Sequence, residues 1–122
     1  MIVAGFGFRE AAGAASLLDA FARALGADRA THLSVARDMA AHGGFRDAVA
    51  ELALPLIEVE GDAMVAIATP TQSPQVIAAR GVGSVAEAVA LAGAGEGASL
   101  KGPRSISGDR MATCAIAVGV PS

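Results

Sequence analysis

Three basic side chains, Lys101, Arg104 and Arg110, fall within ten residues near the C-terminal end of the sequence. The single acidic residue among them is Asp109, although the whole protein carries a formal net charge of -3. A local positive patch on an acidic protein is typical of a site for an anionic ligand. We therefore expect Lys101 and Arg104 to bind a ligand that carries carboxylates.

A second group of candidate ligand-binding residues lies in the N-terminal segment GFGFRE. The segment begins like a dinucleotide-binding fingerprint, but Glu10 occupies the place of the third glycine, so we reject that assignment. Two interpretations stay open. Gly5 and Gly7 let the backbone approach a ligand whose carboxylate Arg9 binds, or the glycines only bend a strand end that carries an exposed arginine.

Hydroxyl groups precede two predicted helices, where free backbone N–H groups and the helix dipole favour an anion. We predict that Thr71, Ser73 and Ser84 donate to the ligand; the alternative is that each caps or turns its own segment. For Ser84 the capping interpretation is the stronger one, because Glu87 follows three residues later. In such a capping box, Ser84 accepts from the N–H of Glu87, and the Glu87 carboxylate accepts from the N–H of Ser84.

The sequence identifies no catalytic residue with a recognisable motif. Its two histidines and one cysteine match no metal-ligand spacing, so no metal site is predicted. Cys114 alternates in phase with apolar residues and is predicted to be a small core residue rather than a nucleophile. The carboxylates that remain as possible general bases are Glu58, Glu60 and Glu87.

The elements that must position these residues follow from hydrophobic periodicity and helix-stop signals. Strands are predicted at residues 1–8, 54–60, 98–101 and 111–118, with a short apolar patch at 31–36. Amphipathic helices are predicted at 17–25 and 45–54, a short helix from Pro74 to Arg80, and a capped helix from Ser84 to Gly93. Strands that alternate with helices predict one α/β domain spanning residues 1–122.

Composition excludes several classes of function. No uninterrupted apolar run approaches the roughly 20 residues that a membrane helix needs. An isoelectric point of about 5.2 and four aromatic residues argue against nucleic-acid binding. A lone cysteine and the absence of a signal-peptide pattern at the N-terminus lead us to expect a cytoplasmic protein.

The segments GFGFRE, TPTQSP, GVGSVAEAVAL and SLKGPRSISGDRMATCAIAV together resemble the CobE/CbiG C-terminal domain family of cobalamin (vitamin B12) biosynthesis. The resemblance covers nearly the whole chain and is closest to the stand-alone CobE type. Phe8 departs from the cysteine that many relatives carry, which argues against thiol chemistry there. The family's pattern falls on Gly5, Gly7, Arg9, Ser84, Val85, Glu87 and Lys101.

The resemblance implies a three-layer α/β/α sandwich with a mixed sheet of about five strands. It also implies a function on corrin-ring intermediates, which are apolar macrocycles fringed with carboxylates. The first hypothesis is a protein that binds a polycarboxylate tetrapyrrole as a carrier or accessory factor, without a cofactor of its own.

The resemblance leaves two other hypotheses open. One is a hydrolase that opens a precorrin ring-A lactone with loss of a two-carbon fragment. The other is an interaction module that completes another cobalamin biosynthesis enzyme. Self-association into a homo-oligomer is left open.

Overall fold

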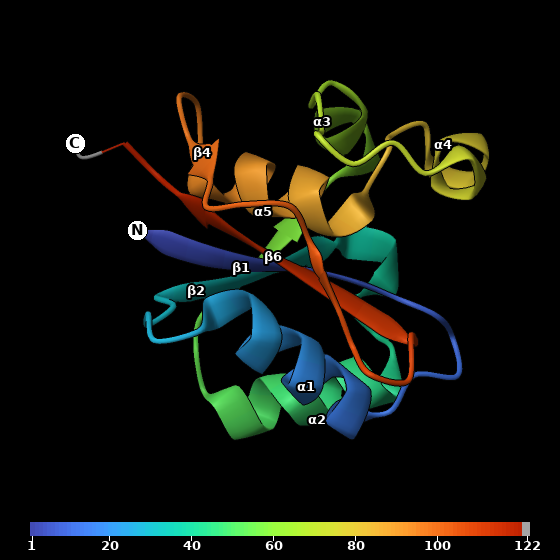
Figure 1. The fold of residues 1–122 in the computed structure, drawn as a ribbon, viewed down its shortest axis with the longest axis vertical. Coiled ribbons are helices and arrows are strands. Elements are labelled where there is room, and N and C mark those ends of the chain that lie inside the picture. Colours follow the sequence, from blue (N-terminus) through green and yellow to red (C-terminus); the bar gives the residue numbers. More distant parts are fainter. Residues whose placement is uncertain (121–122) are drawn as a thin grey trace.

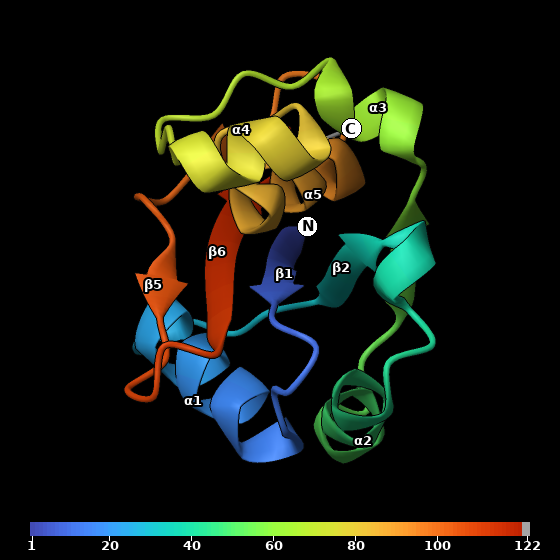
Figure 2. The ribbon, with the colours of Figure 1, turned by 90° about the vertical axis from the view of Figure 1, so that its right-hand side faces the viewer.

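A mixed β-sheet lies between two layers of helices in the computed structural model, which describes residues 1–120 (Figure 1). Helices α1 and α2 cover one face of the sheet, and α3, α4 and α5 lie over the other (Figures 1 and 2). The helices are α1 (Ala14–Leu25), α2 (Gly43–Leu52), α3 (Gly61–Val65), α4 (Pro74–Arg80) and α5 (Val85–Ala94), with a 3-10 turn at Arg37–Met39. The strands are β1 (Ile2–Phe8), β2 (His32–Ala36), β3 (Leu56–Val59), β4 (Ser99–Leu100), β5 (Ser105–Ile106) and β6 (Ala112–Val118).

The sheet has the strand order β3-β2-β1-β6-β4, and β5 also pairs with β6. Strands β1, β2 and β3 are parallel, whereas β6 runs antiparallel to β1 along its whole length. The predicted α/β/α sandwich with a mixed sheet is therefore confirmed, with six strands where about five were expected. The additional strand is β5, which lies between the strands predicted at 98–101 and 111–118 and pairs with the first half of β6.

Small residues allow α5 to lie unusually close to the sheet. The helix reads VAEAVALAGA, and each of its first six residues is buried. A Cβ atom added to Gly5 on β1 would lie 2.4 Å from the backbone oxygen of Ala86 and 2.5 Å from the backbone nitrogen of Ala90. Glycine at position 5 is thus required by the contact between β1 and α5.

The other face of the sheet carries the larger side chains of the core. Phe6 of β1 packs edge-on against Phe45 of α2, with ring centroids 5.8 Å apart, and Leu17 of α1 is fully buried beside them. Cys114 belongs to the same cluster, and burial raises the pKa of its thiol. The prediction that Cys114 is a core residue is confirmed.

The helix boundaries follow from local capping chemistry. Helix α2 begins at Gly43 rather than Phe45 because the His42 side chain accepts a hydrogen bond from the Phe45 N–H. Helix α4 spans Pro74–Arg80 as predicted and stops at Gly81, whose φ of 75° is left-handed.

No single helix in the described part of the chain is long and apolar enough to cross a membrane. The bent pair of α4 and α5 reaches that length and apolarity only when the two helices are taken together.

Candidate functional site

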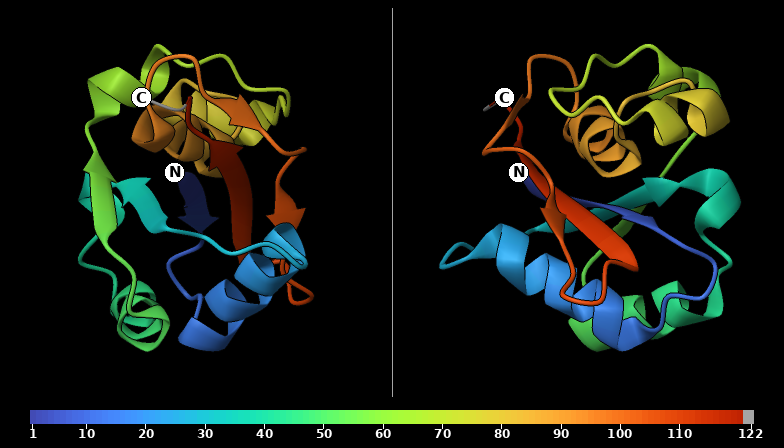
Figure 3. Two further views of the ribbon diagram at one scale, coloured as in Figure 1. Left: turned by 90° about the vertical axis from the view of Figure 1, so that its left-hand side faces the viewer. Right: turned by 45° about the vertical axis from the view of Figure 1, so that its right-hand side comes forward.

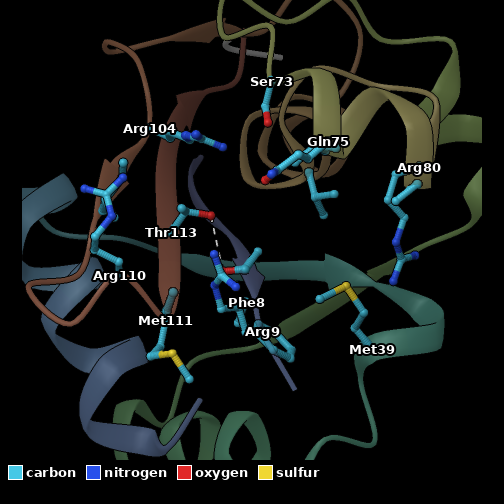
Figure 4. A pocket seen from close by; sticks show the side chains of 16 residues that line it. Phe8, Arg9, Met39, Ser73, Gln75, Arg80, Arg104, Arg110, Met111 and Thr113 are labelled. Carbon is cyan, nitrogen blue, oxygen red and sulfur yellow. Dashed lines mark hydrogen bonds between the residues drawn. The ribbon is translucent and has the colours of Figure 1, made fainter. Parts of the chain in front are cut away.

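A pocket of about 490 Å³ opens where α4 lies over the end of β1 and the start of β6 (Figure 4). The end of β1 contributes Gly7, Phe8 and Arg9, and the start of β6 contributes Ala112 and Thr113. Helix α4 and the β5 segment form two opposite walls. Strand ends of an α/β sheet are a usual place for ligand-binding groups.

Four arginines from four different segments line this pocket: Arg9, Arg80, Arg104 and Arg110. Figure 4 shows their side chains arranged around the opening. None of the described residues that line the pocket is acidic. Arg80 has a carboxylate partner outside the lining, because its Nη1 lies 2.8 Å from Oδ2 of Asp38. The pocket therefore presents an excess of positive charge in a protein of net charge -3.

Arg110 reaches the pocket from a strained turn between β5 and β6. Its φ is 63°, a left-handed conformation that is disfavoured for residues other than the achiral glycine. The turn is closed by a hydrogen bond of 2.9 Å from the N–H of Arg110 to the carbonyl oxygen of Ser107. An arginine is thus kept at a position whose backbone would suit glycine better, which is typical of functional sites.

Two carboxylates fasten this turn to α1. The N–H of Gly108 donates to Oδ2 of Asp19 at 2.7 Å, and this bond lowers the pKa of Asp19. Asp109 accepts from the hydroxyls of Ser107 and Ser16, which lower the pKa of Asp109. The segment that carries Arg110 is therefore held in place by hydrogen bonds to α1.

The Glu87 side chain is completely buried beneath the pocket walls. Its Oε1 accepts from the Thr71 N–H at 2.9 Å, and its Oε2 accepts from the Thr71 hydroxyl at 2.7 Å and from the Arg104 N–H at 2.8 Å. The Ser84 hydroxyl accepts from the Glu87 N–H as predicted. The reciprocal half of the predicted capping box is wrong, because the carboxylate points to two distant segments instead of back to Ser84.

The structure divides the predicted ligand-binding residues into two groups. Gly7, Arg9, Ser73 and Arg104 line the pocket together. The Ser73 hydroxyl makes no capping hydrogen bond to α4, and Figure 4 shows it pointing toward the opening. These four residues remain the predicted contacts to the ligand.

The other four predicted residues lie away from the pocket, each for a local reason. Gly5 is covered by α5, Thr71 donates to Glu87, and Ser84 is buried as the cap of α5. Lys101 forms an ion pair with Asp28, and its N–H donates to the carbonyl of Ile116, toward the far end of β6. The three cations that cluster in the sequence are thus separated in the structure: Arg104 and Arg110 line the pocket, and Lys101 does not.

Sequence reasoning missed Arg80 as a pocket residue. The sequence identified Arg80 only as the last residue of a short predicted helix. No local signal in the sequence places that helix over the ends of β1 and β6. The thioether side chains of Met39 and Met111 also line the pocket, as does Thr113, whose hydroxyl donates to the Gly7 carbonyl at 3.2 Å. Hydrophobic periodicity predicts the strand or turn that contains such a residue, but it does not predict which elements lie side by side in the fold.

The other candidate residues have structural partners. His42 Nδ1 accepts from the Phe45 N–H, so Nε2 carries the proton and donates to the Glu10 carbonyl at 2.7 Å. Glu60 pairs with Arg37 on the surface. Within residues 1–120, no group of three or more His, Cys, Asp or Glu side chains is placed to hold a metal ion.

Comparisons with known proteins agree with this architecture. The sequence profile of the family described as Cobalamin synthesis G C-terminus matches residues 2–117. A comparison with curated protein sequences finds no significant match.

Among solved structures, CobE, a protein from the cobalamin (vitamin B12) biosynthetic pathway, superposes with a TM-score of 0.88 at 25% identity. That match covers 100% of this chain and 92% of CobE. The cobalamin biosynthesis protein ChiG from Agrobacterium tumefaciens str. C58 is 33% identical, with a TM-score of 0.75 and coverage of 99% and 100%.

A cobalamin biosynthesis protein G homologue from Sulfolobus solfataricus shares the fold, with a TM-score of 0.69 at 18% identity. The match covers 95% of this chain and 36% of that one. The profile spans nearly the whole sequence, and the ChiG structure matches it end to end above 30% identity. The chain therefore belongs to the family of cobalamin synthesis G C-terminal domains.

Proposed function

We propose that this protein binds a polycarboxylate corrin-ring intermediate of cobalamin biosynthesis in the pocket between α4 and the ends of β1 and β6. The observation that carries the proposal is the set of four arginines around an opening whose described lining holds no acidic side chain. In this proposal the protein acts as a carrier or accessory factor, and other enzymes of the pathway deliver or receive the ligand.

The chemistry of the pocket suits the chemistry of such a ligand. Corrin precursors carry acetate and propionate groups around an apolar ring, and a planar guanidinium binds a carboxylate through two parallel hydrogen bonds. Phe8, Met39 and Met111 offer apolar and polarisable surface for the edge of the ring. Hydrogen bonds to charged groups contribute about 1.5–3 kcal/mol each, so two or three carboxylate contacts offset much of the entropy of association.

Hydrolysis of a lactone would need a group that activates water in addition to these cations. The described lining of the pocket contains no carboxylate and no imidazole. The carboxylate of Glu87, which accepts from the N–H of the lining residue Arg104, already accepts three hydrogen bonds in the interior. Glu58 and Glu60 lie outside the lining. The geometry therefore favours binding over the lactone hydrolysis that the resemblance left open.

A polypeptide without a bound chromophore does not absorb visible light, so any visible band in a mixture belongs to the corrinoid. Because the protein also lacks Trp and Tyr, it adds little absorption near 280 nm. We would titrate the protein with cobyrinic acid, whose ring carboxylates are free, and with its fully esterified derivative. We expect a saturable spectral shift at one equivalent for the acid and at least about tenfold weaker binding of the ester. Equal affinities for the two compounds would show that the arginines do not recognise carboxylates.

The chain offers a matched pair of variants for the same titration. Arg104→Ala removes a guanidinium at the pocket, whereas Lys101→Ala removes a cation that pairs with Asp28 elsewhere. We expect Arg104→Ala to weaken cobyrinic acid binding at least about tenfold and Lys101→Ala to leave it within about twofold. If Lys101→Ala lost more affinity than Arg104→Ala, the ligand would bind near Lys101, toward the C-terminal end of β6, and the proposed pocket would be wrong.

A further inference from the structure

The two walls of the pocket are tied together by one buried carboxylate. Glu87 lies on the first turn of α5, and its side chain has no exposed surface. Thr71 bonds it from the segment that leads into α4, and Arg104 bonds it from the segment that leads into β5. These two segments carry Ser73 and Arg104, and Figure 4 shows both side chains pointing into the pocket that they line.

A carboxylate in such a place is costly for the fold. Burial of a charged group is unfavourable unless protein donors replace its hydrogen bonds to water. The donors to Glu87 are two backbone N–H groups and one hydroxyl rather than a basic side chain. The N-terminal turn of α5 adds a favourable dipole. An apolar residue would fill the same volume without this cost, but it could not hold two chain segments in register.

We infer that Glu87 is a positioning residue of the ligand site, an inference that rests on the proposed function. Its carboxylate sets the distance between the α4 wall and the Arg104 segment, so the guanidinium of Arg104 and the hydroxyl of Ser73 face the opening before the ligand arrives. Glu87 itself does not line the pocket. It raises affinity because two loops need not be ordered at the moment of binding.

Glu87→Gln tests this role with almost no change in volume. A glutamine side chain offers one acceptor oxygen and one NH₂ donor group. The Thr71 hydroxyl can turn to accept from that NH₂, but a backbone N–H cannot accept. In either orientation of the amide, the N–H of Thr71 or that of Arg104 loses its acceptor, so one pocket wall is released.

Glu96→Gln is the matched control, because it removes the same charge from an exposed position beyond the end of α5. We expect Glu87→Gln to weaken cobyrinic acid binding at least about tenfold at a temperature where the variant is folded, and Glu96→Gln to leave it within about twofold. Hydrogen exchange followed by NMR should show faster exchange at Thr71 or Arg104, with the amides of β1 and β6 still protected. Wild-type affinity in the folded Glu87→Gln variant would overturn the inference.

Two further experiments decide the inference if the variant does not fold or if the wild-type protein does not bind the probe. If Glu87→Gln does not fold, Thr71→Val removes only the hydroxyl donor, and we expect a loss of several-fold in affinity; unchanged binding would overturn the inference. If the wild-type protein binds no cobyrinic acid, the proposed function fails by itself. Hydrogen exchange then still decides whether Glu87 holds the walls, since unchanged exchange at both Thr71 and Arg104 in Glu87→Gln would refute that role.

Discussion

Arg110 offers a test that separates ligand binding from stability. Its backbone conformation favours glycine, whereas the proposed contact with the ligand needs the arginine side chain. Its φ of 63° is left-handed, whereas its guanidinium lines the pocket. We consider the change Arg110→Gly. Glycine adopts this conformation without steric cost, so the substitution relaxes the turn between β5 and β6 and removes one cation from the pocket.

The expected magnitudes follow from these two effects. A left-handed conformation costs an L-residue about 1–2 kcal/mol, whereas glycine loses about 0.5–1 kcal/mol more backbone entropy on folding. We therefore expect the free energy of unfolding of Arg110→Gly to stay within about 1 kcal/mol of wild type or to rise. Loss of a charge-assisted contact of about 1.5–3 kcal/mol should weaken cobyrinic acid binding by roughly tenfold to a hundredfold.

Urea denaturation followed by circular dichroism measures the stability, and visible titration measures the affinity. Ala53→Gly is the control, because Ala53 is also left-handed, with φ 54°, but it ends α2 away from the pocket. We expect Ala53→Gly to stabilise the fold without a change in affinity. If Arg110→Gly is more stable and still binds cobyrinic acid like wild type, Arg110 is not a ligand contact and our interpretation of its strained backbone is wrong.

Three other predictions concern the scaffold. Gly5→Ala should lower the free energy of unfolding by about 1–3 kcal/mol or more, because its Cβ would meet the backbone of α5, whereas Gly13→Ala, which faces open space, should be nearly neutral in urea denaturation. The pKa values of Asp19 and Asp109 are lowered in the folded protein, so their stabilising effect is complete above the unfolded-state pKa near 4 and is lost as the pH falls through the lower folded-state pKa. Stability should be flat from pH 7 to about 5 and decline below about pH 4; a decline centred near pH 6 would contradict this assignment. Cys114 should resist Ellman's reagent in the native protein and react promptly in urea, and rapid native labelling would show that the thiol is accessible.

Local patterns in the sequence were sufficient for most elements of the fold. Period-two alternation located β1 and β6, Ser73-Pro74 and Gly81 delimited α4, and Ser84 marked the start of α5. These signals are properties of neighbouring residues along the chain. They failed where an element is too short to show a period, as in β5 and α3, and where a cap from an unexpected residue, His42, moved the start of α2.

The sequence by itself also determined the chemistry available to a ligand, because its basic residues are mostly arginines and three cations cluster near its C-terminal end. The tertiary structure decided which of these cations act together. Lys101 and Arg104 are three residues apart, yet β4 and β5 pair with opposite ends of β6 and carry them away from each other. Arg80 joins the pocket because α4 lies over strand ends far away in the sequence.

Glu87 shows the same distinction at the level of single atoms. The sequence spacing of Ser84 and Glu87 correctly indicated a helix N-terminus, because a capping hydrogen bond depends only on residues within one turn. The destination of the carboxylate was settled by Thr71 and Arg104, which are 16 and 17 residues away along the chain. Local spacing therefore determines where a helix starts, whereas the packing of distant segments determines which parts of the chain its buried residues hold in place.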